Sequence, residues 1–140
     1  MPPGNSLLAP ILVVDDSPAN VRLLIRILER GGYMEVTGIT DPRSVLDRAK
    51  EIAPHLIILD LHMPHADGLA VMRDVRSSLR DVPKFLVVTG AVEEGIRSLA
   101  LAQGADDVLT KPFQMDDALR RVQLLLERND DSMGGPSPPR

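Results

Sequence analysis

Residues 11–18 read ILVVDDSP, and this stretch decides the fold. Four apolar residues without polar alternation predict a short β-strand that is covered on both faces, as in a parallel sheet. The strand ends at Asp15-Asp16, and Ser17-Pro18 then supplies an N-cap and a first helical residue. The stretch therefore predicts a strand, an acidic turn and a helix in succession.

The same succession recurs along the rest of the chain. Further strands are predicted at Met34 to Ile39, Leu56 to Leu59, Phe85 to Val88 and Val108-Leu109. Helices are predicted from Ser17-Pro18, from Asp41-Pro42, from about Gly68 through Leu79, from about Val92 to Gln103, and around Met115 to Leu126. Strands that alternate with helices predict an α/β fold with a doubly wound, five-stranded parallel sheet and five helices that cover both faces.

The two ends of the chain differ in composition from the part between them. Residues 1–10 include three prolines and one glycine and are predicted to be a flexible lead. Residues 130–140 combine Asp, Ser, Gly and Pro with almost nothing to bury, so a tail or linker is predicted there. Residues 11–129 lie within the usual size range of one domain, and we expect them to fold as one.

The composition excludes several classes of protein. A net charge of −4 at pH 7 offers no attraction for the phosphate backbone of nucleic acid, so direct nucleic acid binding is not expected. Without cysteine the chain can form no disulfide, thiolate metal site or cysteine nucleophile. The N-terminal stretch has no basic region, and the apolar run ends at two aspartates, so we expect a cytoplasmic protein without a membrane partner.

Polar residues stand at the ends of four predicted strands. Asp15 and Asp16 follow the first strand, Asp60 the third, Thr89 the fourth and Lys111 the fifth. The carboxyl ends of parallel strands border the binding crevice of a doubly wound sheet, so these residues are predicted to converge. Three carboxylates repel one another unless a cation neutralises them. Oxygen ligands without His or Cys favour Mg²⁺, which predicts a site for phosphoryl chemistry.

Asp60 is the predicted nucleophile, because it ends a central buried strand where its carboxylate can meet phosphorus in line. Asp15 or Asp16 would hold the metal. Lys111 would balance the charge of the phosphoryl group, and the Thr89 hydroxyl would donate a hydrogen bond to it. Each residue alone also has a structural explanation as a helix cap, strand filler or turn. Their conjunction favours the functional interpretation.

Four short motifs stand in order along the chain: Asp15-Asp16, Leu59-Asp60-Leu61-His62-Met63-Pro64 with Gly68, Thr89-Gly90, and Lys111-Pro112-Phe113. Together they resemble the receiver domain of two-component response regulators. The resemblance covers about Ile11 to Arg128. It implies the strand order 2-1-3-4-5, Mg²⁺ as the cofactor, and a phosphohistidine donor on a sensor histidine kinase or phosphotransfer protein.

The resemblance also implies a role for each matching residue. The implied roles are phosphoacceptor for Asp60, metal ligands for Asp15, Asp16, Asp60 and the backbone carbonyl of His62, switch hydroxyl for Thr89, and conserved lysine for Lys111. A cis peptide is implied at Lys111-Pro112. The family commonly has an aromatic residue three positions before the lysine. Here that residue is Val108, which is too short and too stiff to swing between buried and exposed positions.

The predicted function is a signalling switch, not an enzyme beyond its own phosphorylation and slow autodephosphorylation. Its output would reach a downstream domain or protein partner, with a homodimer through the fourth-to-fifth-helix face as one form. Leu124, Leu125 and Leu126 point in three directions around the last helix, so we expect one of them to face outward.

The same sequence offers four alternatives to the switch. A Mg²⁺-dependent aspartyl-phosphate phosphatase would use the same nucleophile. Such enzymes resemble one another in an Asp-x-Asp motif, and this chain has His62 at the position of the second aspartate. A flavodoxin-like carrier needs a phosphate-binding loop where Asp15-Asp16 would repel phosphate. A metal site at His62 and His65 lacks a third ligand, so solvated loop histidines are expected. A phosphoryl relay or sink without an output change stays open.

Overall fold

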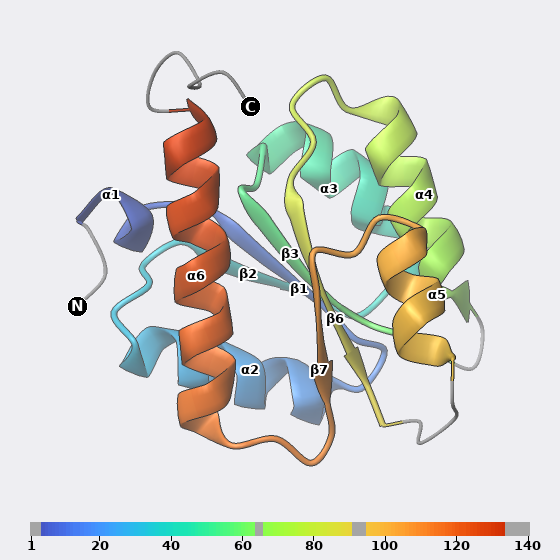
Figure 1. The fold of residues 1–140 in the computed structure, drawn as a ribbon, viewed down its shortest axis with the longest axis horizontal. Helices are drawn as coiled ribbons and strands as arrows, with labels where there is room; N and C mark the ends of the chain where they lie inside the picture. Colours follow the sequence, from blue (N-terminus) through green and yellow to red (C-terminus); the bar gives the residue numbers. More distant parts are fainter. Residues whose placement is uncertain (1–3, 64–65, 91–94, 134–140) are drawn as a thin grey trace.

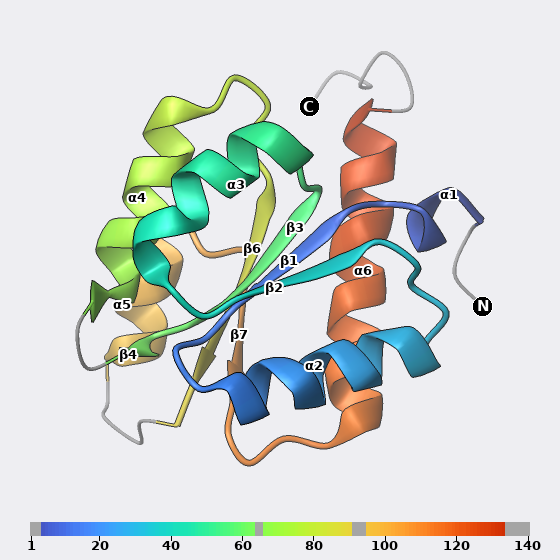
Figure 2. The same cartoon turned by 180° about the vertical axis from the view of Figure 1, so that it is seen from behind.

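The computed structural model describes residues 4–63, 66–90 and 95–133. Five parallel strands form one sheet, in the order β2-β1-β3-β6-β7 (Figure 2). These strands are β2 (Val36–Ile39), β1 (Ile11–Val14), β3 (Leu56–Asp60), β6 (Lys84–Thr89) and β7 (Asp107–Thr110). The predicted doubly wound sheet and its strand order are confirmed.

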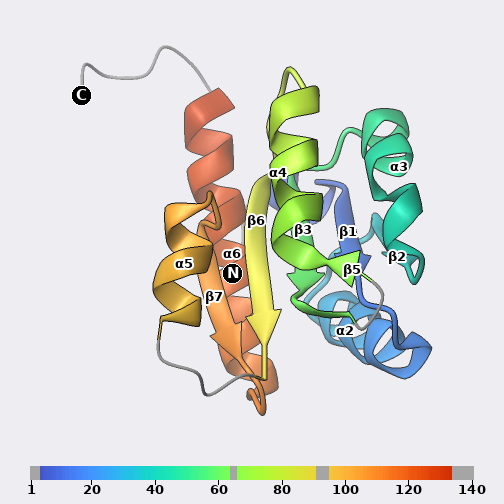
Figure 3. The same ribbon diagram turned by 90° about the vertical axis from the view of Figure 1, so that its right-hand side faces the viewer.

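The parallel register brings the ends of neighbouring strands to one edge of the sheet. Along the sheet the paired residues are Val14 with Leu59, Asp60 with Val88, and Thr89 with Thr110. The arrowheads of β6 and β7 point the same way in the side view (Figure 3). Asp15, Asp60, Thr89 and Lys111 therefore all stand at or just beyond the carboxyl edge.

Helices cover both faces of the sheet, as Figure 1 shows. One face packs against α2 (Pro18–Arg30) and α6 (Met115–Met133), and the other against α3 (Val45–Ile52), α4 (Gly68–Ser78) and α5 (Ile96–Ala102). Alternate residues of β1 enter opposite cores: Ile11 and Val13 face α2 and α6, whereas Leu12 and Val14 face the other helices. Both cores are mainly aliphatic. Within the described residues, no helix combines the length and apolarity needed to cross a membrane.

Local sequence signals explain where two of these helices begin. At α2 the Ser17 hydroxyl accepts a hydrogen bond from the Asn20 amide at 3.3 Å, and proline follows Ser17, as predicted. At α4 the Asp67 carboxylate accepts from the Leu69 amide at 3.0 Å. Asp67 also belongs to a hairpin of β4 (His62–Met63) with β5 (Ala66–Asp67), which was not predicted because two-residue strands carry no periodicity.

Regular structure extends into parts of the two segments that were predicted to lie outside the domain. Within the predicted lead, Gly4–Leu7 forms α1, which packs against α6. The Met34 amide donates to the Leu7 carbonyl at 3.1 Å, and Ala9 is buried, so contacts distant in sequence override the local composition. Helix α6 continues to Met133, four residues beyond the predicted boundary. Residues 1–3 and 134–140 lie outside the described residues, and the division into lead, domain and tail stays a prediction.

Three other boundaries differ from the predictions. Strand β2 begins at Val36, and Met34 before it is exposed. The second helix starts as a 3-10 turn, η1 (Pro42–Ser44), before α3. Helix α5 begins at Ile96, and residues 91–94, where part of this helix was predicted, lie outside the described residues.

Candidate functional site

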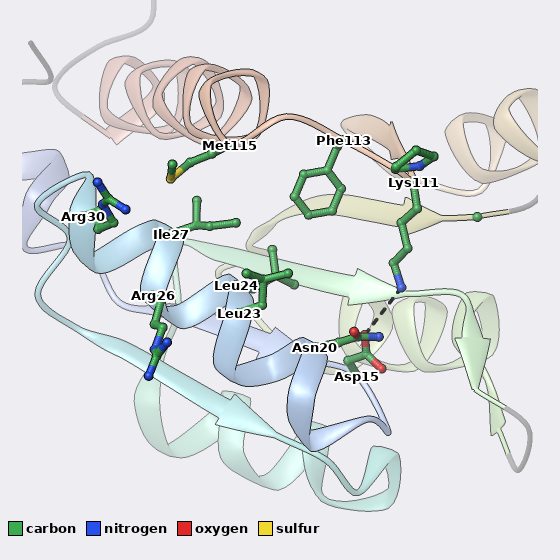
Figure 4. A pocket seen from close by; sticks show the side chains of 12 residues that line it. Asp15, Asn20, Leu23, Leu24, Arg26, Ile27, Arg30, Lys111, Phe113 and Met115 are labelled. Carbon is green, nitrogen blue, oxygen red and sulfur yellow. Dashed lines mark ion pairs between the residues drawn. The ribbon is translucent and has the colours of Figure 1, made fainter.

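Three charged side chains meet at the carboxyl edge of the sheet. Asp15 follows β1 and Asp60 ends β3, and the two residues are only 1% and 4% exposed. Lys111 Nζ lies 3.2 Å from Asp60 Oδ2 and 3.8 Å from Asp15 Oδ2. Figure 4 shows Lys111 reaching down toward Asp15. Two buried carboxylates therefore share one ammonium group.

Each carboxylate is oriented by a backbone amide two residues further along the chain. The Ser17 amide donates to Asp15 Oδ1 at 2.9 Å, and the His62 amide donates to Asp60 Oδ1 at 2.9 Å. The Oδ2 atoms are the ones that approach Lys111. The turns after the two strands thus hold both carboxylates in the same manner, with one oxygen bound to backbone and one directed at the cation.

The pairing at Asp15 is incomplete. Its Oδ2 atom is buried and has no hydrogen-bond partner among the described residues, since Lys111 at 3.8 Å is an ion-pair contact only. Burial raises the pKa of Asp15, and the charge of Asp60 raises it further, against the lowering effects of the Ser17 amide and Lys111. The site therefore fits a divalent cation with a preference for oxygen ligands, which would stabilise both carboxylates in their charged form.

Asp16 lies apart from this cluster. It lines a separate cavity of about 420 Å³ together with Thr40, Asp41, Pro42, Arg43, Met63 and Ala66. In the described part of the chain, no three His, Cys, Asp or Glu side chains come close enough together to hold a metal ion. Three carboxylates were predicted to converge, and the structure brings two of them together, those of Asp15 and Asp60. Metal binding by Asp16 and by the His62 carbonyl stays a prediction.

Thr89 and Lys111 are joined through the backbone. Thr89 ends β6 and is buried, and its carbonyl accepts a hydrogen bond from the Lys111 amide at 2.8 Å. The Lys111-Pro112 peptide is cis, as the resemblance implied. A displacement of either residue is therefore passed directly to the other.

Gly68 of the motif is required by a close approach to the acceptor strand. A Cβ atom at this position would lie 3.1 Å from the Asp60 carbonyl oxygen and 2.9 Å from a methyl group of Leu61. A larger residue would push the start of α4 away from the loop that follows Asp60. The glycine therefore helps to keep the acceptor loop close to the helix.

A cavity of about 820 Å³ extends from the charged cluster along α2 (Figure 4). Asp15 and Lys111 lie at one end, and Arg26 and Arg30 lie toward the other. Apolar side chains lie between the two ends: Leu23, Leu24, Ile27, Phe113 and Met115. This cavity leaves room for a partner beside the cluster.

A second charged cluster, which sequence reasoning missed, joins α5, β7 and α6. The Val108 carbonyl accepts hydrogen bonds from Arg97 at 3.2 Å and from Arg121 at 3.1 Å. Arg121 also binds both oxygens of Asp107 at 2.9 Å and those of Asp117 at 3.2 and 3.3 Å. The spacing of Asp117 and Arg121 by four residues was the available signal. The Val108 side chain is buried, as its size predicts.

Two further predictions concern exposed residues. Leu124 is 50% exposed whereas Leu125 and Leu126 are buried, so Leu124 is the outward-facing leucine of the last helix. His62 is exposed, in agreement with a solvated loop histidine. His65 lies outside the described residues.

Comparison with models of known protein families assigns the chain to one of them. The family model described as "Response regulator receiver domain" matches residues 11–123. The chain belongs to this family. Receiver domains are typically Mg²⁺-dependent and are generally not enzymes in the usual sense, and a two-component regulator implies a sensor kinase partner.

Relatives of this receiver domain include longer regulators. The chain is 39% identical over 120 residues to the alkaline phosphatase synthesis transcriptional regulatory protein PhoP of Bacillus subtilis (strain 168), with 86% of this chain and 49% of PhoP covered. It is 38% identical over 118 residues to the transcriptional regulatory protein BaeR of Escherichia coli O6:H1, with 84% and 48% covered. The chain therefore spans about half the length of these curated relatives.

Solved structures share the receiver fold. A signal receiver domain from Bermanella marisrubri is 35% identical with a TM-score of 0.77, over 84% of this chain and 97% of that one. A CheY-like receiver domain protein from Methanospirillum hungatei JF-1 is 27% identical with a TM-score of 0.81, over 89% and 98%. The sheet order and the covering helices described above are therefore those of a receiver domain.

Proposed function

We propose that this receiver domain accepts a phosphoryl group on Asp60 from a phosphohistidine of a sensor histidine kinase or phosphotransfer protein. The observation that carries the proposal is the buried pair of Asp15 and Asp60, which share Lys111 as their one cationic partner among the described residues. Such a cluster has an excess of negative charge and an unpartnered oxygen, which favours cation binding and phosphoryl chemistry over a purely structural ion pair.

Asp60 acts as the nucleophile. An Asp60 oxygen attacks the phosphorus in line while the bond from phosphorus to the donor imidazole nitrogen breaks. The electron pair of the broken bond stays on the imidazole, and the new P–O bond makes an aspartyl phosphate. The His62 amide at 2.9 Å keeps the carboxylate oriented during the attack. The product is a mixed anhydride, whose slow hydrolysis returns Asp60 to its starting state.

The residues that would hold Mg²⁺ are Asp15, Asp16, Asp60 and the backbone carbonyl of His62. When bound, the ion offsets the charge of the carboxylates and of the transferred group. Asp15 is supported as a ligand by its buried, unpartnered Oδ2 atom. Asp16 is exposed in part and belongs to the neighbouring cavity, so it would have to turn toward the cluster.

Lys111 and Thr89 respond to the phosphoryl group. Lys111 already contacts Asp60 and would transfer part of its ion pairing to the phosphoryl oxygens. The Thr89 hydroxyl would donate a hydrogen bond to the same group. Because the Lys111 amide is bound to the Thr89 carbonyl at 2.8 Å, the two responses are linked. The chain thus promotes its own phosphorylation and slow dephosphorylation without turning over a separate substrate.

The output is proposed to leave the domain through the face formed by α5, β7 and α6. This face carries the exposed Leu124 and the cluster of Arg97, Asp107 and Arg121, which could serve a downstream output domain, a protein partner or a homodimer. A cytoplasmic location belongs to this proposal, because the donor is a sensor kinase. A relay or sink that passes the phosphoryl group on without changing this face is the second candidate, and Val108 in place of the usual aromatic favours it.

Intact mass spectrometry tests the proposal. The 140-residue chain is incubated with Mg²⁺ and a small-molecule acyl phosphate, alongside Asp60→Asn and Asp67→Asn. We expect one added phosphoryl group on the wild type and on Asp67→Asn, which changes only the cap of α4, and none on Asp60→Asn. Equal uptake by all three proteins, or uptake by none, would contradict the proposal.

A further inference from the structure

Helix α5 is held in place by few apolar contacts. Ala100 is its only fully buried residue among Ile96–Ala102, whereas α2 buries four residues and α4 buries Leu69, Met72 and Val75 together with Gly68. Elements with few buried apolar contacts open at low free energy cost. Polar contacts at the two ends of α5 therefore carry much of its attachment to the domain.

Among the described residues, which omit 91–94, more contacts are made by the C-terminal end of α5 than by its N-terminal end. Hydrogen bonds from the amides of Gln103 and Ala105 close the helix, and two arginines of α4 reach the same end. Arg73 donates to the Gln103 side chain and Arg76 to the Gly104 carbonyl at 3.4 Å. The N-terminal end begins at Gly95, which has a φ of +93° and provides no side-chain cap. Motion of α5 should therefore occur mainly at its N-terminal turn.

Arg97 connects that turn to β7. Its guanidinium donates to the Val108 carbonyl at 3.2 Å and lies 3.9 Å from Asp107. Arg121 binds the same carbonyl and the same carboxylate, but its side chain is 26% exposed against 57% for Arg97, and it has additional hydrogen bonds to Asp117. Of the two arginines on the Val108 carbonyl, Arg97 thus has the weaker attachment and is the one that can leave first.

Strand β7 leads directly to Lys111. Val108 lies three residues before Lys111, and the pairing of Thr110 with Thr89 ties this strand to the end of β6. Any movement of Lys111 and Thr89 toward a phosphoryl group shifts the strand that holds the Val108 carbonyl. The distance between this carbonyl and Arg97 then changes, although the buried Val108 side chain keeps its place.

We propose that Arg97 is a switch residue: it binds the N-terminal turn of α5 to Asp107 and Val108 in the unphosphorylated chain, and phosphorylation of Asp60 releases it. This inference rests on the proposed function of Asp60. The hydrogen bond from Arg97 to the Val108 carbonyl would then transmit the signal at the position where the family commonly has a rotating aromatic side chain. Release of Arg97 frees both the N-terminal turn of α5 and a positive charge on the output face.

Amide hydrogen exchange of the 140-residue chain tests the proposal, with Arg97→Ala compared with Arg120→Ala. Arg120 is a matched control, because its ion pair among the described residues is with Asp117 of its own helix. Without phosphoryl donor, we expect exchange across residues 96–102 to be about fivefold faster in Arg97→Ala than in the wild type, as for the loss of one or two hydrogen bonds. Arg120→Ala should match the wild type.

Phosphorylation separates this proposal from the function on which it rests. With Mg²⁺ and an acyl phosphate, all three proteins should gain one phosphoryl group by intact mass. Exchange at residues 96–102 should rise in the wild type and in Arg120→Ala, and should rise no further in Arg97→Ala. Failure of uptake would contradict the function of Asp60. Normal uptake with the same exchange in Arg97→Ala as in the wild type before phosphorylation, or with the same rise in both proteins on phosphorylation, would overturn the role of Arg97.

Discussion

Two charged clusters of this receiver domain differ in how completely their charges are paired. At the carboxyl edge, the buried Asp15 and Asp60 share Lys111, and Asp15 Oδ2 has no hydrogen-bond partner among the described residues. On the α5–β7–α6 face, the partly buried Arg121 binds both oxygens of Asp107 and of Asp117. The first cluster is buried and short of positive charge, whereas the second lies nearer the surface and is more completely paired.

The difference in pairing suits the two clusters to different roles. An incompletely paired buried cluster is costly, because desolvated charges repel, and it is relieved only when a cation or a neutralising group arrives. In a paired cluster nearer the surface, an exposed ion pair such as that of Arg97 with Asp107 stabilises little, so it can be exchanged without unfolding the domain. We therefore propose that binding and phosphoryl transfer take place at the edge cluster, and that the surface cluster transmits the signal.

Mg²⁺ is expected to have the largest effect on the free energy of unfolding, because it binds at the edge cluster. At a concentration 100 times its Kd, a ligand of the folded state adds about 2.7 kcal/mol to the free energy of unfolding. Thermal melting with and without millimolar Mg²⁺ measures this shift. Asp16→Ala should reduce it, whereas Asp41→Ala should preserve it, because Asp41 is already paired with Arg43 at 3.1 Å. A midpoint that does not respond to Mg²⁺ would contradict metal binding.

Removal of Arg121 should have the second largest effect on the free energy of unfolding. It measures how much the surface cluster stabilises the domain. Arg121→Ala is expected to lower the free energy of unfolding by about 1–3 kcal/mol, because hydrogen bonds to charged groups are lost from a partly buried site. Arg120→Ala, with its 73% exposed side chain, should stay within about 0.5 kcal/mol of the wild type. Urea unfolding compares them, and equal losses would show that the cluster stabilises nothing beyond a surface ion pair.

The pH dependence of stability should distinguish the edge cluster from an ordinary ion pair. Because burial raises the pKa of Asp15 above its usual 3.8, the metal-free folded state binds a proton more readily than the unfolded state. Asp15 then lowers stability above its folded pKa, and this loss disappears as the pH falls toward 3.8.

Asp15→Asn should reveal that loss directly. At pH 7 in a chelator, we expect the variant to be more stable than the wild type, because the cost of burying the Asp15 charge is removed. The difference should shrink on acidification and should reverse when Mg²⁺ is added, because the variant lacks a ligand. Urea unfolding at several pH values measures it. A difference that is constant from pH 7 to pH 4 would exclude titration of Asp15 as its cause.

His62 should have the smallest effect, and only on the lifetime of the aspartyl phosphate. The His62 amide orients Asp60, whereas the His62 side chain is exposed. Substitution therefore keeps the backbone contact and changes only the side chain near the water that hydrolyses the aspartyl phosphate. His62→Ala and His62→Asn are expected to change the dephosphorylation rate within about tenfold, or about 1.4 kcal/mol in the barrier. Decay of the phosphorylated mass over time gives the rate. Identical rates in all three proteins would remove the His62 side chain from the reaction.

Much of the fold follows from local sequence signals. Unbroken apolar runs such as Ile11–Val14 predict strands that are buried on both faces, and Ser17 with Pro18 predicts where α2 begins. Helix α1 and the hairpin of β4 with β5 could not be predicted, because short elements have no periodicity and depend on tertiary contacts such as the one between Met34 and Leu7.

The candidate site was predicted in part. Strand ends placed Asp15, Asp60, Thr89 and Lys111 at one edge, since parallel strands share their direction. The position of Asp16 could not be read, because the side chains of consecutive residues point to opposite sides and only coordinates show which one enters the cluster. The contacts of Arg97 and Arg121 with the Val108 carbonyl were missed, since a backbone carbonyl leaves no trace in side-chain patterns.

Chemical localisation of the phosphoryl group tests the central claim most directly. Borohydride reduces an aspartyl phosphate to homoserine, so the chain is phosphorylated with an acyl phosphate and Mg²⁺, reduced, digested and sequenced by mass spectrometry. We predict homoserine at residue 60 and aspartate at residues 15 and 16. Homoserine at either of those neighbours, or its absence from a chain that has gained the mass of a phosphoryl group, would contradict the assignment of Asp60 as the acceptor.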